Sequence, residues 1–170
     1  MTTKTLPPIL GTGTGAAPAP APVLHLMTAM LWDLDGTLNF CEQRSKFNWD
    51  DVDGCTETMR NHPPNWPLIS MANAMHAHCQ PTAHNLIATA RPERYRTFTE
   101  WWLERHKVKY SGLFMRPDDN MQPDAEVKRA ILQELRKRYN IWFVVEDRAK
   151  VVEMWREEGV LCLQCAEGNY

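Results

Sequence analysis

Four runs of mostly apolar residues recur along the chain, and three of them end in or directly before polar or acidic residues. A continuous apolar run, without the alternation of a half-exposed strand, is typical of a strand that is buried on both faces of a parallel sheet. The predicted strands are residues 23–32, 84–90, 141–147 and 160–166.

Between these runs, apolar residues recur at helical spacing. The pattern predicts helices over residues 97–106 and 124–139, with Asp124 as the cap of the second. A short helix over RAKVVEMWREEG then ends at Gly159, which suits the position after a C-cap. Strands that alternate with helices predict an α/β fold in which helices flank a parallel sheet.

The rest of the chain sets the domain organisation. Residues 1–22 are rich in Thr, Gly, Ala and Pro, which predicts a flexible tail and leaves residues 23–170 as one domain. Residues 39–80 join the first two strands and are long enough for a helix and a small insertion. We therefore expect a small or absent cap and an open site.

The adjacent Trp101 and Trp102 cannot both face the core.

Composition narrows the class of protein. Hydrophobic residues make up 44% of the 170 residues, and no apolar stretch approaches the roughly 20 residues that span a bilayer, so we expect a soluble protein with no membrane contact. The formal net charge of -2 gives no overall attraction for nucleic acid, so any such contact needs a local basic patch. Five cysteines at irregular spacing, with no secretory signal, favour the cytoplasm.

Three weaker motifs are discounted. Cys162 and Cys165 have metal-site spacing, but they lie in a strand-like run with no second ligand pair, which disfavours a zinc or redox role. The GTGTG segment, residues 11–15, has no Lys-Ser or Lys-Thr after it, as a phosphate-binding loop would. One group of possible metal ligands is more typical of scattered surface residues: His76, His78, Cys79 and His84.

Polar side chains gather where three predicted strands end, and ligands of parallel sheets bind at that edge. The pairs are Asp33 with Asp35, Thr89 with Arg91, and Glu146 with Asp147. Clustered carboxylates are stable beside a divalent cation, and Mg²⁺ prefers oxygen ligands such as those of Asp33, Asp35 and Asp147.

The same residue types suit phosphoryl transfer. One aspartate can attack phosphorus while its neighbour two residues on, which strand alternation aims at the same side, protonates the leaving oxygen. Thr89 and Lys128 would bind the phosphate oxygens. Taken singly, Asp33 and Asp35 also suit a turn before Gly36, and Lys128 alone is more typical of a solvated helix face.

Together these residues resemble the four motifs of the haloacid dehalogenase (HAD) superfamily of phosphotransferases. The motifs are Asp33-Leu34-Asp35-Gly36-Thr37, Thr89, Lys128 and Glu146-Asp147. Four longer runs, at residues 43–50, 89–93, 113–128 and 143–170, resemble the 3′-phosphatase domain of the phage polynucleotide kinase-phosphatases. The resemblance covers residues 28–170 and implies a Rossmann-like HAD fold. No GxxxxGK[ST] loop is present, so we expect a phosphatase without its own kinase.

The resemblance also implies roles for residues. Asp33 would be the nucleophile and a metal ligand. Asp35 would be the general acid and base and would offer its main-chain carbonyl to Mg²⁺. Asp147 would be the third protein ligand, with Glu146 supporting it, although the family more often has Asp in place of Glu146.

Four further residues receive roles from the same resemblance. Thr89 and Lys128 would hold the phosphate. Arg44 and Arg91 would contact substrate or order the site. Asp124 lies four residues before the lysine, and we expect it to orient Lys128 along one helix.

The leading hypothesis is a Mg²⁺-dependent phosphomonoesterase that removes the 3′-terminal phosphate from DNA or RNA through an aspartyl-phosphate. The alternative is a nucleoside monophosphate phosphatase with the same mechanism, and a third hypothesis is an inactive module that binds nucleic acid ends. Arg94 and Arg96 beside Tyr95 suit a nucleic acid backbone and a stacked base, or equally a solvated helix start. A separate kinase or ligase would be a partner, in the host cytoplasm if the protein is phage-encoded.

Overall fold

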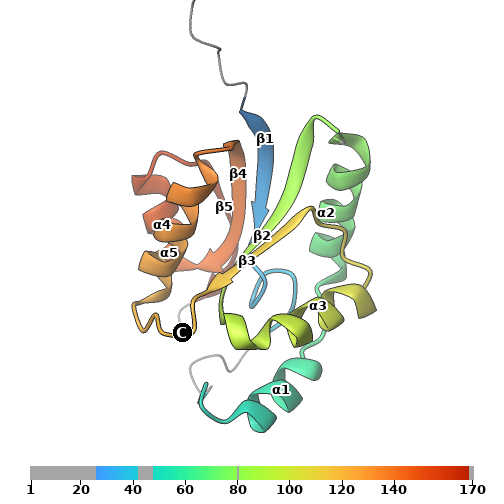
Figure 1. The fold of residues 1–170 in the computed structure, drawn as a ribbon. Coiled ribbons are helices and arrows are strands. Elements are labelled where there is room, and N and C mark those ends of the chain that lie inside the picture. Colours follow the sequence, from blue (N-terminus) through green and yellow to red (C-terminus); the bar gives the residue numbers. More distant parts are fainter. Residues whose placement is uncertain (1–25, 42–47, 80, 169–170) are drawn as a thin grey trace, which may run out of the picture.

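The computed structural model describes residues 26–41, 48–79 and 81–168. Their core is a five-stranded sheet in which every pair of neighbouring strands is parallel, in the order β3-β2-β1-β4-β5 (Figure 1). The strands are β1 (Met27–Trp32), β2 (Ala83–Pro92), β3 (Gly112–Arg116), β4 (Tyr139–Arg148) and β5 (Cys162–Gly168).

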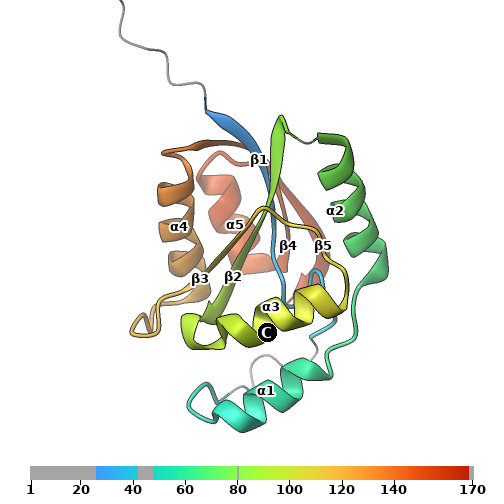
Figure 2. The ribbon, with the colours of Figure 1, turned by 45° about the vertical axis from the view of Figure 1, so that its right-hand side comes forward.

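Helices cover both faces of the sheet (Figures 1 and 2). The pair α4 and α5 packs on one face, around Leu132 and Trp155, while α2 and α3 pack on the other, around Ile69 and Trp102. The helices are α1 (Val52–Arg60), α2 (Trp66–Cys79), α3 (Arg96–Arg105), α4 (Asp124–Leu135) and α5 (Ala149–Glu157), with a 3-10 turn, η2 (Glu93–Tyr95), before α3. The predicted α/β fold with a parallel sheet flanked by helices is confirmed.

The central position of β1 fixes where the chemistry of the chain can lie. Its last four residues are fully buried, and it pairs with β2 on one side and with β4 on the other. Residues that follow Trp32 therefore emerge between the ends of two neighbouring strands. Such an edge is where open α/β sheets bind ligands.

The sequence patterns missed β3 and misplaced several boundaries. The five residues of β3 form an edge of the sheet, begin at Gly112 and are only partly buried except for Met115, so they leave no continuous apolar signal. The last predicted strand begins two residues late, at Cys162, because the amide of Val160 still donates to Trp155 O in the turn that ends α5.

Three predicted helix ends differ in how well they match the structure. Gly159 has a φ of +74°, and its amide donates to Arg156 O, so its predicted place after the C-cap is confirmed. The helix predicted to reach residue 139 ends at Leu135, because Tyr139 already pairs with Met27 in the sheet. The cap of α4 is Pro123 rather than the predicted Asp124, whose carboxylate binds arginines instead.

The segment between β1 and β2 holds two helices. One of them, α2, packs on the sheet, and the other, α1, lies below α3 beyond the carboxyl edge (Figure 2). This matches the expected helix with a small insertion. Residues 1–22, predicted to be a flexible tail, lie outside the described residues. In the part of the chain that is described, every helix is too short or too polar to cross a bilayer.

The adjacent tryptophans of α3 differ as expected. Trp102 is fully buried and donates a 3.3 Å hydrogen bond from Nε1 to His62 O, whereas Trp101 is 37% exposed. We predict that Trp102→Ala lowers the free energy of unfolding by about 3–5 kcal/mol, because it leaves a large cavity in the core. Trp101→Ala, its matched control, should cost about 1 kcal/mol. Urea unfolding followed by circular dichroism measures both, and equal losses would contradict this packing.

Candidate active site

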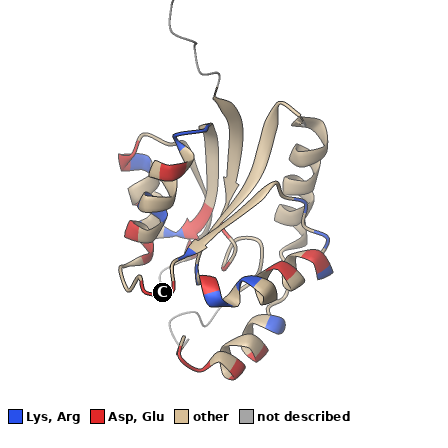
Figure 3. Ribbon diagram, viewed as in Figure 1, with Lys and Arg blue, Asp and Glu red and all other residues tan. Residues whose placement is uncertain are grey.

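The fully buried charges of the described chain all converge at the carboxyl edge of the sheet. Figure 3 shows the strands uncharged over most of their length, with red and blue near their lower ends. The carboxylates, ammonium and guanidinium that are at most 2% exposed belong to Asp33, Asp35, Arg91, Lys128, Glu146 and Asp147. Because isolated charges are costly to bury, each of these groups must be compensated within the cluster.

Lys128 joins two of the carboxylates. It lies in the second turn of α4, and its Nζ donates to Asp33 Oδ1 and, at 2.6 Å, to Glu146 Oε2. Burial raises the pKa of Glu146, and the nearby ammonium of Lys128 opposes that shift. The helical spacing alone favoured a solvated lysine, but the side chain is 2% exposed.

Asp35 faces a different set of partners. Its two carboxylate oxygens accept hydrogen bonds of 2.8 and 2.5 Å from Nε and Nη2 of Arg91, and Asn39 Nδ2 donates to it at 3.0 Å. Strand alternation does not aim Asp33 and Asp35 at the same side, because β1 ends at Trp32. Asp35 lies in a turn that Gly36 makes possible with a φ of +92°.

Arg91 is itself held in place by a hydrogen bond from its guanidinium to a residue of α3. Its Nη1 donates to Thr99 Oγ1 of α3 at 3.3 Å, and its own side chain is fully buried. Thr89 lies two residues earlier on β2, also fully buried, and its hydroxyl oxygen accepts the amide of Arg91 at 3.3 Å. The guanidinium therefore fixes the orientation of the Asp35 carboxylate.

Asp147 lies in a tight cradle at the end of β4. Thr37 Oγ1 donates to its Oδ1 at 3.4 Å, and Gln164 donates to its main-chain oxygen at 3.0 Å. A Cβ on Gly168 would lie 2.3 Å from Asp147 Oδ2, so only a residue without a side chain fits there. The patterns gave no role to Gly168, and nothing in the sequence distinguishes it from an ordinary loop glycine.

Asp124 binds two arginines. Its two oxygens bind Arg116 at the end of β3 and Arg148 at the end of β4. It thus ties the first turn of α4, the helix that carries Lys128, to two strands, and its expected effect on the orientation of Lys128 stays a prediction. Arg44, the remaining residue of the predicted set, lies outside the described residues.

The charges of the cluster fit a divalent cation. Among the described residues, four buried carboxylates lie around one buried ammonium and one buried guanidinium, so acidic groups outnumber basic ones. Ligand oxygens of Asp33, Glu146 and Asp147 lie within 4.8 Å of one another. All are hard oxygen donors, the type that Mg²⁺ prefers. Glu146 already uses both of its oxygens, Oε2 for Lys128 and Oε1 for the amide of Arg148, whereas Asp33 binds Lys128 through Oδ1, so Asp33 and Asp147 are the carboxylates best placed to hold such an ion.

A second group of possible ligands is less suitable. Asp35, Cys41 and His62 also come within 4.8 Å of one another. A cation there would stand beside the guanidinium of Arg91, which already binds both oxygens of Asp35. The electrostatic repulsion disfavours a metal at this position.

The sequence disfavours metal binding by two cysteines and by a group of histidines. Burial raises the pKa of Cys162 to about 12, so its thiol is protonated at neutral pH and is not a ready metal ligand. The group of His76, His78, Cys79 and His84 forms no metal-ligand cluster within the described residues.

Comparison with known proteins identifies relatives of this arrangement. The sequence model of the polynucleotide kinase PNKP phosphatase domain matches residues 27–170. A putative bifunctional polynucleotide kinase/RNA ligase of Autographa californica nuclear polyhedrosis virus is 28% identical over 142 residues, which cover 76% of this chain and 18% of the viral protein.

Solved structures agree with this assignment. Two structures of a complex of Pnkp1, Rnl and Hen1, one described as an RNA repair complex, match with a TM-score of 0.73 and identities of 27% and 25%. They cover 94% of this chain, which spans about half of the matched chains, 48% and 53%. The HAD domain of the effector Lem4 from Legionella pneumophila, at 11% identity and a TM-score of 0.53, shares the fold, with 85% of this chain and 88% of that one covered.

The crowding of buried carboxylates generates a prediction about metal binding. Asp147→Asn removes one of these like charges and keeps an oxygen that accepts from Thr37, so the metal-free protein should melt about 2–4 °C higher. Its affinity for Mg²⁺ should fall by about tenfold or more, because a ligand charge is lost. Thermal melts with and without Mg²⁺ measure both effects. Asp119→Asn, an exposed control, should change neither, and an unchanged Mg²⁺ response in Asp147→Asn would contradict the proposed ligand.

Proposed function

The chain belongs to the family of the polynucleotide kinase PNKP phosphatase domain and is a HAD phosphatase, and from this premise we propose that it is a Mg²⁺-dependent polynucleotide 3′-phosphatase. The observation that carries the proposal is the buried cluster of four carboxylates and two cations at the sheet edge. That cluster provides a nucleophile, an acid-base group and a place for a divalent cation within one site. Mg²⁺, when bound, would neutralise phosphate charge and so permit attack by an anionic carboxylate.

In the first half of the proposed reaction, a carboxylate oxygen of Asp33 attacks phosphorus. A bond forms between that oxygen and phosphorus, the bond from phosphorus to the ribose 3′ oxygen breaks, and an aspartyl-phosphate results. The leaving oxygen takes a proton from the Asp35 carboxyl. Lys128, which holds Asp33 in place, is close enough to donate to the phosphoryl oxygens as their negative charge is redistributed.

In the second half, water attacks the phosphorus of the aspartyl-phosphate. Asp35 takes a proton from that water, the bond to Asp33 breaks, and inorganic phosphate leaves. The three hydrogen bonds that Asp35 accepts from Arg91 and Asn39 stabilise its ionised form, which is the form that serves as the base. To act as the acid in the first half, the carboxyl must turn from Arg91 towards the leaving oxygen.

The other residues have supporting parts in this proposal. Thr89 lies on β2 at the same edge, where its hydroxyl can reach the phosphate. Arg91 orders Asp35, Glu146 fixes Lys128, and Asp124 fixes the start of α4. Arg44 remains a proposed substrate contact.

The substrate and the partners follow from the relatives. Those relatives carry names that refer to polynucleotide kinase, RNA ligase and RNA repair. We therefore place nucleic acid 3′ ends, RNA among them, ahead of free nucleotides as the substrate. A kinase or ligase supplied by the rest of a longer protein or by a separate chain would act on the same ends.

The nucleophile and the substrate can be tested together. Asp33→Asn should lower phosphate release by about 10³-fold or more, because the amide cannot form the acyl phosphate. The measurement compares a 3′-phosphorylated oligonucleotide with nucleoside monophosphates, with and without a chelator, and Asp119→Asn serves as the control. Unchanged release by Asp33→Asn would refute the covalent route, and a clear preference for mononucleotides would favour a nucleotidase.

A further inference from the structure

A hollow of about 350 Å³ lies between α1 and α3, the two helices at the bottom of Figure 2. Its charged lining residues are both arginines, Arg60 and Arg94, and no carboxylate lines it in the part of the chain that the structure describes. The remaining lining residues are mainly aromatic or small: Val52, Thr56, Tyr95, Thr97, Phe98 and Trp101. In a chain with a formal net charge of -2, this is a local basic and aromatic surface.

Two arginine side chains stack on the ring of Trp101, and one of them, Arg60, lines the hollow. The guanidinium carbons of Arg60, from α1, and Arg105, from α3, lie 5.7 and 5.5 Å from the centre of the Trp101 ring. Within the described residues, neither arginine forms an ion pair. A guanidinium stacked on indole keeps N–H donors at its edge, and these suit phosphate oxygens.

The aromatic side chains offer a surface for stacking. Phe98 and Trp101 lie side by side on α3, with ring centres 5.2 Å apart, and Trp101 is 37% exposed. What distinguishes Trp101 from other exposed tryptophans of the chain is its place beside a second aromatic ring in a basic hollow, a combination that suits a planar, anionic ligand.

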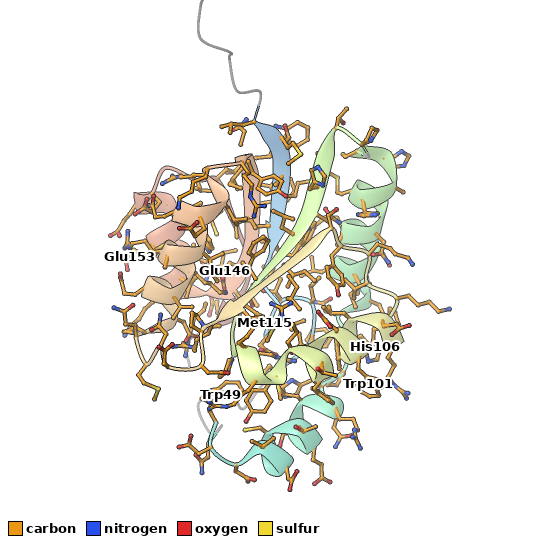
Figure 4. The ribbon with its side chains drawn as sticks, viewed as in Figure 1. Trp49, Trp101, His106, Met115, Glu146 and Glu153 are labelled. Carbon is orange, nitrogen blue, oxygen red and sulfur yellow. The ribbon has the colours of Figure 1, made fainter. Side chains whose placement is uncertain are left out.

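A second hollow shares a lining residue with the first and includes residues next to those of the active site. This hollow of about 350 Å³ is lined by Trp49, Pro92, Arg94 and Arg116, and Arg94 lines both. Pro92 directly follows Arg91 of the site, and Arg116 binds Asp124. Figure 4 shows Trp49 and Trp101 near opposite ends of α3, facing α1. We call these two hollows, which share Arg94, the α1–α3 groove.

In the second hollow, nearby carboxylates partly neutralise the positive charge of Arg94. Asp50 and Asp118 lie 3.7 and 3.9 Å from its guanidinium. The favourable interactions with an anion therefore concentrate at the far end of the groove, around Arg60, Arg105 and Trp101. A ligand must extend away from the catalytic edge to reach them.

Resting on the proposed function, we propose that the α1–α3 groove binds the single-stranded nucleic acid segment that precedes the 3′-terminal phosphate. Backbone phosphates lie against Arg60 and Arg105, and bases pack against Phe98 and the exposed part of Trp101. A basic groove with aromatic side chains binds single strands with little sequence preference. The groove thus distinguishes a polynucleotide end from a mononucleotide, since only the former reaches from the catalytic edge to Trp101.

The test measures how activity depends on substrate length. Wild type, Arg60→Gln and Trp101→Ala are assayed on a 3′-nucleoside monophosphate and on 3′-phosphorylated single strands of about two to about eight nucleotides. Arg138→Gln is the matched control, because Arg138 stacks on Tyr139 at 5.8 Å and lies at the amino end of β4, away from the groove. Circular dichroism verifies that each variant is folded.

Wild-type kcat/KM is expected to rise with length. In Trp101→Ala, this increase of kcat/KM with substrate length should be smaller by about five-fold or more. In Arg60→Gln the slope of log(kcat/KM) against log[salt] should become less steep by about 0.7, which corresponds to the loss of one phosphate contact on a single strand. Arg138→Gln should match wild type in both respects.

The outcomes separate this inference from the proposed function. If wild type releases no phosphate from any 3′-phosphorylated substrate, the proposed function is wrong. If wild type is active on oligonucleotides but shows no rise with length, or if Arg60→Gln and Trp101→Ala keep the whole rise, the groove is not the binding surface and the phosphatase assignment stands.

Discussion

The contact between Lys128 and the carboxylates of Asp33 and Glu146 is the interaction on which this structure depends. It holds one ammonium against two buried acids while Arg91 holds a third, so buried carboxylates outnumber buried cations among the described residues. A group of buried carboxylates of this kind is costly to a folded protein and is typical of a site that a cation completes. The stability of the core and the capacity for catalysis are therefore opposed at this edge of the sheet.

The buried charges lie where the edge of the sheet meets the helices that cover its two faces. β1 lies between β2 and β4, so the loop after Trp32 emerges beside the ends of both neighbours. Lys128 then comes from α4 on one face, and Thr99 supports Arg91 from α3 on the other. The helix α1 lies beyond this edge, and the α1–α3 groove lies between it and α3.

Sequence patterns predicted the fold and most of the cluster, because buried parallel strands leave long apolar runs and Asp33, Thr89, Glu146 and Asp147 lie at or just beyond their ends. They could not predict β3, which is short and half-exposed, nor the divergence of Asp33 and Asp35, which depends on where β1 stops. Gly168 matters only because Asp147 lies 2.3 Å from the position of its missing Cβ. The arginine partners of Asp124 come from distant strands, which local spacing does not reveal.

The most direct test of the account is a crystal structure with Mg²⁺ and beryllium fluoride, which mimics a phosphoryl group on a carboxylate. The account predicts beryllium bonded to a carboxylate oxygen of Asp33, with the metal held by Asp33, Asp147 and the main-chain oxygen of Asp35. Lys128 should contact the fluoride atoms. Beryllium fluoride on another residue, or a metal bound away from the cluster, would contradict it.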